Sequence, residues 1–140
     1  MLKKTLLGLV ISLGLTSNLV AGDLKADMAQ IGATMIEANI GFLTNNKAAT
    51  LAAIIKLKKE AHGVFTDKKT ITALLPDDVK YKASIAINSA QLIEKYTTQI
   101  EEDLNDRSLR MINKQMRTQK AFVEIQKQCF RCHNLVRDWQ

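Results

Sequence analysis

The C-terminal quarter of the chain, residues 107–140, reads RSLRMINKQMRTQKAFVEIQKQCFRCHNLVRDWQ. Apolar residues in the second half of this stretch recur at steps of three and four, at Phe122, Ile125, Cys129, Cys132, Val136 and Trp139. Such steps place side chains on one face of an α-helix. The pattern predicts a helix from about Arg107 almost to the end of the chain, preceded by a turn at residues 105–106.

Three earlier stretches carry the same periodicity. The first starts at Leu24 and has apolar residues at Leu24, Met28, Ile31, Met35, Ala38 and Phe42. The second covers about residues 47–65, with an apolar side formed by Leu51, Ile54, Ile55, Ala61 and Phe65. The third covers about residues 77–104 and passes through Ile85, Asn88, Leu92 and Tyr96. Residues 45–46 separate the first two helices, and a longer connection around residues 67–78 leads into the third.

These four predicted helices, joined by three connections of which two are short, indicate the fold class. The expected fold is all-α, an antiparallel up-down-up-down four-helix bundle. Composition agrees, because 140 residues fit one domain, and one proline and six glycines supply too few turns for a β-sandwich. Residues 22–140 are therefore expected to form a single helical domain.

Residues 1–21 have the pattern of a secretory signal peptide. Two lysines at positions 3 and 4 precede an apolar run over residues 5–15, and a more polar segment ends in Ala21. This order of segments predicts cleavage near Ala21 and export through the Sec pathway to the periplasm. An uncleaved membrane anchor is the alternative, but the run is short for a spanning helix. After cleavage we expect no stable membrane insertion.

The sequence Cys129-Phe-Arg-Cys132-His133 lies late in the predicted fourth helix. Cys-x-x-Cys-His is the attachment signature of c-type haem. Two thiols three residues apart lie on one helix face, where each can add to one vinyl group of the porphyrin. The imidazole of His133 then lies beside Cys132 and can reach the iron. The motif predicts one covalently attached haem c.

Three other interpretations of the two cysteines remain. A disulfide or thioredoxin-like redox pair normally opens a helix in a βαβ setting, which this chain lacks. A zinc site would combine Cys129 and Cys132 with His62 and His133, but the second half of the usual paired spacing is missing. A chance match of the pattern is the third, although it occurs alongside a predicted secretion signal and contains both cysteines of the chain.

A four-helix pattern that ends in this motif resembles the class II cytochromes c, the family of cytochrome c′ and its low-spin relatives. The resemblance rests on Cys129, Cys132 and His133, with Arg137 as the basic residue that follows and Phe65 closing the second helix. It implies a haem-binding role for Arg137 and His133 as the proximal iron ligand. It also implies a monomer, or a homodimer packed through the first two helices.

The ligand on the other side of the iron is open among Met28, Met35, His62 and no residue at all. The first helix begins where the fourth ends, which favours Met28, and Met28 also matches the distal position of the family. A methionine ligand stabilises ferrous iron and raises the reduction potential. Without a sixth ligand, the resemblance implies an apolar pocket that binds NO or CO.

The expected function is that of a periplasmic electron carrier with His133 and Met28 on the iron, and not that of an enzyme. The fourth helix is strongly basic, with eight lysines and arginines against one acid, Glu124, between Arg107 and Arg137. Two interpretations stay open: a face that is simply solvated, or a surface that steers an acidic redox partner. Nucleic acid is a poor candidate because no aromatic platform interleaves the charges.

Overall fold

The structure is a computed structural model that describes residues 24–136, with side chains described as far as residue 134. Four long helices are present: α1 (Leu24–Leu43), α2 (Lys47–Val64), α4 (Ala83–Asn105) and α5 (Met111–Val136). Between α2 and α4 lie the short helix α3 (Lys68–Leu74) and the 3₁₀ helix η1 (Asp77–Lys82). No strand occurs in this part of the chain, and the predicted all-α class is confirmed.

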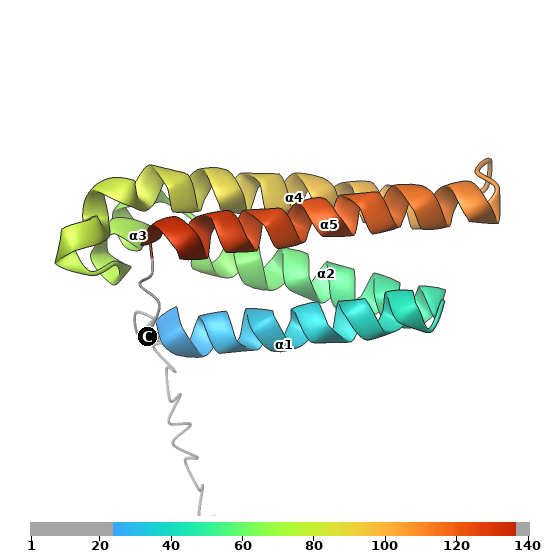
Figure 1. Cartoon of the computed structure of the whole chain (residues 1–140), viewed down its shortest axis with the longest axis horizontal. Coiled ribbons are helices and arrows are strands. Elements are labelled where there is room, and N and C mark those ends of the chain that lie inside the picture. Colours follow the sequence, from blue (N-terminus) through green and yellow to red (C-terminus); the bar gives the residue numbers. More distant parts are fainter. Residues whose placement is uncertain (1–23, 137–140) are drawn as a thin grey trace, which may run out of the picture.

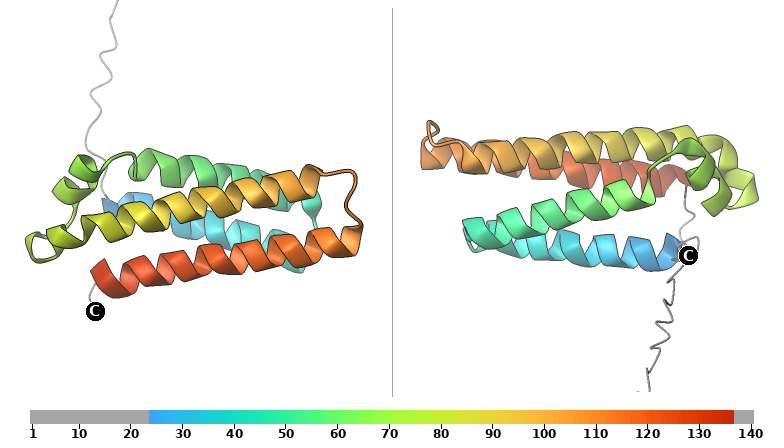
Figure 2. Two further views of the ribbon diagram at one scale, coloured as in Figure 1. Left: turned by 90° about the horizontal axis from the view of Figure 1, so that it is seen from above. Right: turned by 180° about the vertical axis from the view of Figure 1, so that it is seen from behind.

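The long helices lie side by side as two hairpins, α1 with α2 and α4 with α5 (Figures 1 and 2). The hairpins meet through α2 and α4. Ion pairs cross each of these interfaces: Lys56 with Glu37 at 3.1 Å, Lys58 with Glu101 at 3.6 Å, and Arg117 with Asp103 at 2.8 Å. The start of α1 and the end of α5 lie at one end of the molecule, together with α3 and η1 (Figure 1).

The α1–α2 turn brings two backbones unusually close. A Cβ atom on Gly41 would lie 2.6 Å from Thr50 Oγ1 and 2.8 Å from the Thr50 backbone nitrogen. Asn45 takes a positive φ of 52°, which asparagine tolerates better than most residues. Asn46 then caps α2 by accepting a hydrogen bond from the backbone N–H of Ala49 at 3.0 Å. The break predicted at residues 45–46 is confirmed.

The connection expected around residues 67–78 contains helix α3, which the sequence pattern did not predict. Asp67 caps α3 by accepting a hydrogen bond from the Thr70 backbone N–H at 2.9 Å. Ile71 and Leu75 are buried in a small second cluster, which holds the short helix in place. The third predicted helix does begin at Asp77, but its first six residues are 3₁₀ and the α-helix starts at Ala83.

The fourth predicted helix begins at Met111, four residues later than the expected Arg107. Asp106 accepts hydrogen bonds at 2.7 Å from both the backbone N–H and the hydroxyl of Ser108. This local turn competes with helix formation, as short polar side chains do. The α4–α5 connection is therefore longer than predicted.

The main core lies between the two hairpins. Its members are Ile31, Ala38, Ala53, Ile54, Leu57, Ala61, Ile93, Ile100, Leu104, Ala121, Phe122 and Ile125. The predicted stripes on α1 and α5 are confirmed where side chains are described, but Ile55 of α2 is exposed. On α4 the predicted face is wrong by one residue, because the buried positions are Ala83, Ala86, Ser89, Ala90, Ile93, Thr97, Ile100, Asp103 and Leu104.

Two predictions fall outside the described residues, the signal peptide at 1–21 and the role of Arg137. Among the helices of residues 24–136, none is long and apolar enough to cross a membrane.

Candidate functional site

Cys129 and Cys132 lie one turn apart near the end of α5, and no disulfide joins them. Both side chains are half-buried. Cys129 packs against the main core, whereas Cys132 packs against the second cluster, formed by Ile71, Leu75, Ala83 and Ala86. The two thiols therefore face the interior at the end of the molecule where α1 begins.

The surroundings of both thiols are apolar, and this sets their protonation. Burial raises the pKa of the Cys132 thiol from the usual 9.0 to about 11, and the neighbouring Cys129 adds to the effect. Burial also raises the pKa of Cys129. Redox-active cysteines have lowered pKa values, because the thiolate is the reactive form. The environment thus argues against the interpretation of Cys129 and Cys132 as a redox pair.

His133 lies on the side of α5 that faces α1. Phe122 marks this side, because its ring lies 4.8 Å from the ring of Phe42 on α1, measured between centroids. His133 follows Phe122 by eleven residues, which is close to three full turns, so the two residues share a side of the helix. Its side chain is exposed there. The imidazole therefore lies on the same side of α5 as the ring of Phe122.

Met28, Met35 and Phe42 form a row along α1 at steps of seven residues. Since Phe42 contacts α5, the row faces α5, and both methionines pack half-buried against the main core together with Cys129. An α-helix rises about 1.5 Å per residue, so positions along both helices can be counted from the contact between Phe42 and Phe122. On α1, Met28 lies about 21 Å and Met35 about 10 Å from this contact. On α5, His133 lies about 17 Å from it. His133 is thus closer to the level of Met28.

A second contact, between the α1–α2 turn and α5, also places His133 closer to the level of Met28 than to that of Met35. Gln115 Nε2 donates a hydrogen bond to Asn45 Oδ1 at 3.1 Å. Counted from this bond, His133 is 18 residues along α5, Met28 is 17 residues back along the chain, and Met35 is only 10. Both counts therefore place His133 closer to the level of Met28 than to that of Met35, at the end of the molecule where α1 begins (Figure 1).

His62 is not brought to this place. It is 67% exposed, and its Nδ1 lies 3.9 Å from Glu94 Oε2 on α4. That contact places the imidazole on the α2–α4 side of the molecule, away from the α1–α5 interface. Within the described residues, no group of three histidine, cysteine or acidic side chains is placed to hold a metal ion. The zinc interpretation of the cysteines and His62 thus gains no support.

Four buried side-chain oxygen atoms have no hydrogen-bond partner among the described residues. They are Thr34 Oγ1, Glu60 Oε2, Ser89 Oγ and Gln128 Oε1. Gln128 directly precedes Cys129, and Thr34 directly precedes Met35. A buried polar atom without a partner is costly, and such atoms commonly mark a place for water or a ligand. Two inward-facing thiols, a half-buried methionine and an imidazole are the side-chain types that attach haem c and bind its iron.

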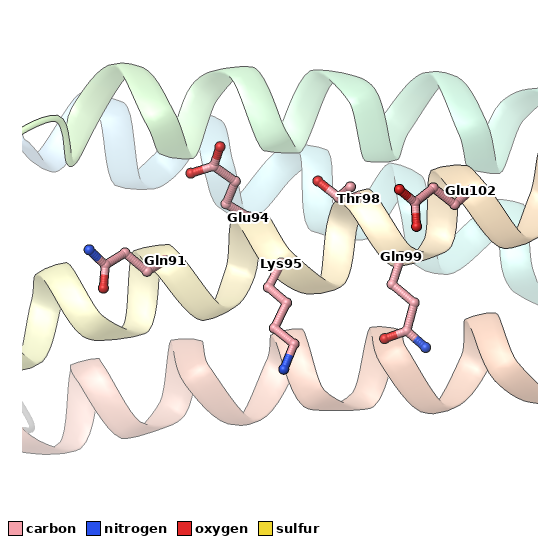
Figure 3. Close-up of a pocket in the computed structure, with 6 residues that line it drawn as sticks. All are labelled: Gln91, Glu94, Lys95, Thr98, Gln99 and Glu102. Carbon is pink, nitrogen blue, oxygen red and sulfur yellow. The ribbon is translucent and has the colours of Figure 1, made fainter.

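Sequence reasoning did not find these four atoms. Nothing in the local sequence signals that an oxygen atom of these side chains is buried without a partner. A hollow on the outer face of α4 was not predicted either. It is lined by polar and charged side chains that point toward α2 or α5 (Figure 3): Gln91, Glu94, Lys95, Thr98, Gln99 and Glu102. It contains no thiol or imidazole, and it is separate from the motif.

Comparison with known proteins gives no relative for this chain. No protein-family model, no curated protein and no solved structure matches it.

Proposed function

We propose that the protein is a periplasmic monohaem c-type cytochrome that carries electrons, built as an up-down-up-down four-helix bundle. The observation that carries this proposal is the Cys129–His133 motif on α5, with both thiols free and turned inward at the end of the bundle where α1 presents Met28. The resemblance to class II cytochromes c supports it. Under this proposal the molecule transfers electrons and does not act as an enzyme.

The residues at the site have separate roles in this proposal. Cys129 and Cys132 would hold haem c through two thioether bonds, and His133 would bind the iron from α5. Bound haem iron supplies a one-electron couple between the ferrous and ferric states. Met28 would bind from α1, where its soft thioether favours the ferrous state. The apolar packing around both methionines would limit reorganisation when charge moves.

A second function is favoured by the packing of the methionines. Met28 and Met35 lie half-buried within an apolar cluster, which is also the usual place of a methionine that only fills space. If Met28 does not reach the iron, His133 alone binds it and the opposite side is an apolar pocket. Such a site would take small neutral ligands such as NO or CO, as the resemblance to cytochrome c′ implies.

The optical spectrum of the holoprotein, oxidised and reduced, with and without CO, distinguishes the two functions. A low-spin spectrum with a methionine-to-iron charge-transfer band that CO leaves unchanged is expected for the electron carrier. A high-spin spectrum that shifts with CO would instead support gas binding. Protein that retains no haem after denaturation would refute both.

Two matched variants then identify the sixth ligand. Met28→Ala should convert a low-spin spectrum to a high-spin one. Met35→Ala changes the methionine seven residues further along the same side of α1 and should leave the spectrum low-spin. The reverse result would transfer the role to Met35. His133→Ala should change the spectrum while the thioethers keep the haem attached, and an unchanged spectrum would remove His133 from the iron.

A further inference from the structure

The outward face of α5 carries a row of large apolar side chains that nothing in the described structure covers. Their exposed fractions are high: Ile112 56%, Met116 64%, Val123 46% and Phe130 66%. The steps of four, seven and seven residues keep all four on one side of the helix. This side points away from Ala121 and Ile125, which face the core. We call these four residues the α5 stripe.

The α5 stripe is long and unusual for a face in contact with water. Its ends are 18 residues apart, which is about 27 Å along the helix. Contiguous exposed apolar surface on a soluble domain commonly marks an interaction site. The helices that pack against α5 lie on its other side, so this face stands open at the edge of the bundle (Figure 2).

Cations border the α5 stripe along one edge, at Lys120, Lys127 and Arg131. Within residues 24–136 neither Lys120 nor Arg131 makes an ion pair, and Lys127 pairs at 2.6 Å with Glu124. Glu124 is the one acidic residue between Met111 and Val136. An apolar centre with a polar rim of one sign is complementary to a partner whose surface carries the opposite sign.

One end of the α5 stripe lies within the motif itself, because Phe130 stands between Cys129 and Arg131. A protein docked on the stripe would therefore contact the residue next to a haem-bearing cysteine. We propose that the α5 stripe and the cations along its edge, Lys120, Lys127 and Arg131, are the docking surface for an acidic redox protein. This inference rests on the proposed electron-carrier function.

A second copy of the chain fits this surface less well. Pairing two α5 helices would bring two strongly basic faces together, and like charges across an interface oppose association. An acidic partner gains from the same charges, since complementary potentials raise the rate of encounter. The cations along the edge therefore favour an acidic partner, whereas the α5 stripe supplies the contact area.

The test uses the haem-loaded chain and a small acidic blue-copper protein as the probe. Stopped-flow absorbance gives the second-order rate of electron transfer at low and at high ionic strength. Lys120→Glu/Lys127→Glu should slow this rate at least about tenfold at low ionic strength. The effect should shrink at high ionic strength, where exposed charges are screened. Val123→Ser should slow the rate at both ionic strengths.

The matched control is Lys59→Glu/Lys69→Glu, which makes the same change in net charge at exposed positions of α2 and α3. It should change the rate less than about threefold, because these charges lie away from the docking surface. Equal slowing by both double variants would overturn the proposal, as it would show an effect of net charge alone. No slowing by either α5 variant would overturn it too.

Two further readouts separate the docking surface from the proposed function. Backbone amide shifts in the NMR spectrum should change along residues 112–131 when the probe is added, and shifts confined elsewhere would contradict the proposal. Reduction by a small neutral reagent should be equal in the parent and all variants. A holoprotein that no reagent reduces would refute the electron carrier itself. Loss of a dimer in sedimentation on Val123→Ser would show that a second copy occupies the stripe.

Discussion

In the haem-free protein, the thiol of Cys132 should react far more slowly with an alkylating reagent than an ordinary cysteine. Its pKa is raised from 9.0 to about 11, chiefly by burial. The nucleophile is the thiolate, so the reaction rate follows the fraction of thiol that is deprotonated. The perturbation is treatment of the folded protein with iodoacetamide, and trypsin, which cleaves after Arg131, separates the Cys132 peptide from the Cys129 peptide.

The magnitude follows from the two pKa values. At pH 8 a thiol with a pKa of 9.0 is about one-tenth ionised, whereas one with a pKa of about 11 is about one-thousandth ionised. The folded protein should therefore react about 100-fold more slowly than the same chain in guanidinium chloride. The pH profile should differ as well, because the rate for Cys132 should keep rising between pH 9 and 11, where an ordinary thiol levels off.

Mass spectrometry of samples quenched over time measures this rate, and the unfolded chain is the internal reference. A folded rate within about threefold of the unfolded rate would refute the inward placement of Cys132. The pH dependence of folding stability gives an independent check that the pKa is raised and not lowered. A pKa that is higher in the folded state means that the fold prefers the protonated thiol. The haem-free fold should therefore lose stability as pH rises from 9 through 11, and unfolding midpoints in urea would show it.

Three further predictions concern packing. Arg117→Leu leaves the buried carboxylate of Asp103 without its partner and should lower the free energy of unfolding in urea titrations by about 2 kcal/mol. The loss is smaller than for a fully buried pair because Arg117 is 53% exposed. A loss under about 0.5 kcal/mol would contradict this prediction. Gly41→Ala should destabilise by about 1–3 kcal/mol because its methyl group would overlap α2, while Gly63→Ala, with nothing within 4 Å, should not destabilise. Ile36→Glu should abolish any homodimer in sedimentation, because Ile36 is 63% exposed on the outer face of α1; a dimer that survives would use another face.

Periodicity predicted the long helices well because each has a face that must be buried, and it failed where two neighbouring faces of one helix are both apolar. On α4 the larger apolar side chains Ile85, Leu92 and Tyr96 are only half-buried, at the edge of the interface. The buried face of α4 combines small residues such as Ala86 and Ser89 with Ile93, Ile100 and Leu104. Because Ile85, Leu92 and Tyr96 are also apolar, the pattern alone did not decide which of two neighbouring faces is buried.

The placement of the candidate-site residues was also predictable only in part. The placement of Cys129, Cys132 and His133 within one turn of α5 follows from helix geometry alone, so the sequence is sufficient to predict it. The level of Met28 relative to His133 depends on where α1 and α5 touch, and contacts far from the motif set that register. Sequence spacing within one helix contains no information about such contacts. For the same reason the lack of partners at Gln128 became visible only in the folded chain.

The packing of the thiols also constrains when haem could be attached under the proposed function. Cys132 lies against the cluster formed by α3 and the start of α4, and Cys129 lies against the main core. Each thiol must reach a vinyl group to form its thioether, and in this packing both face protein. Under the proposed function, attachment before the end of α5 closes against α3 would leave both thiols free to reach the vinyl groups.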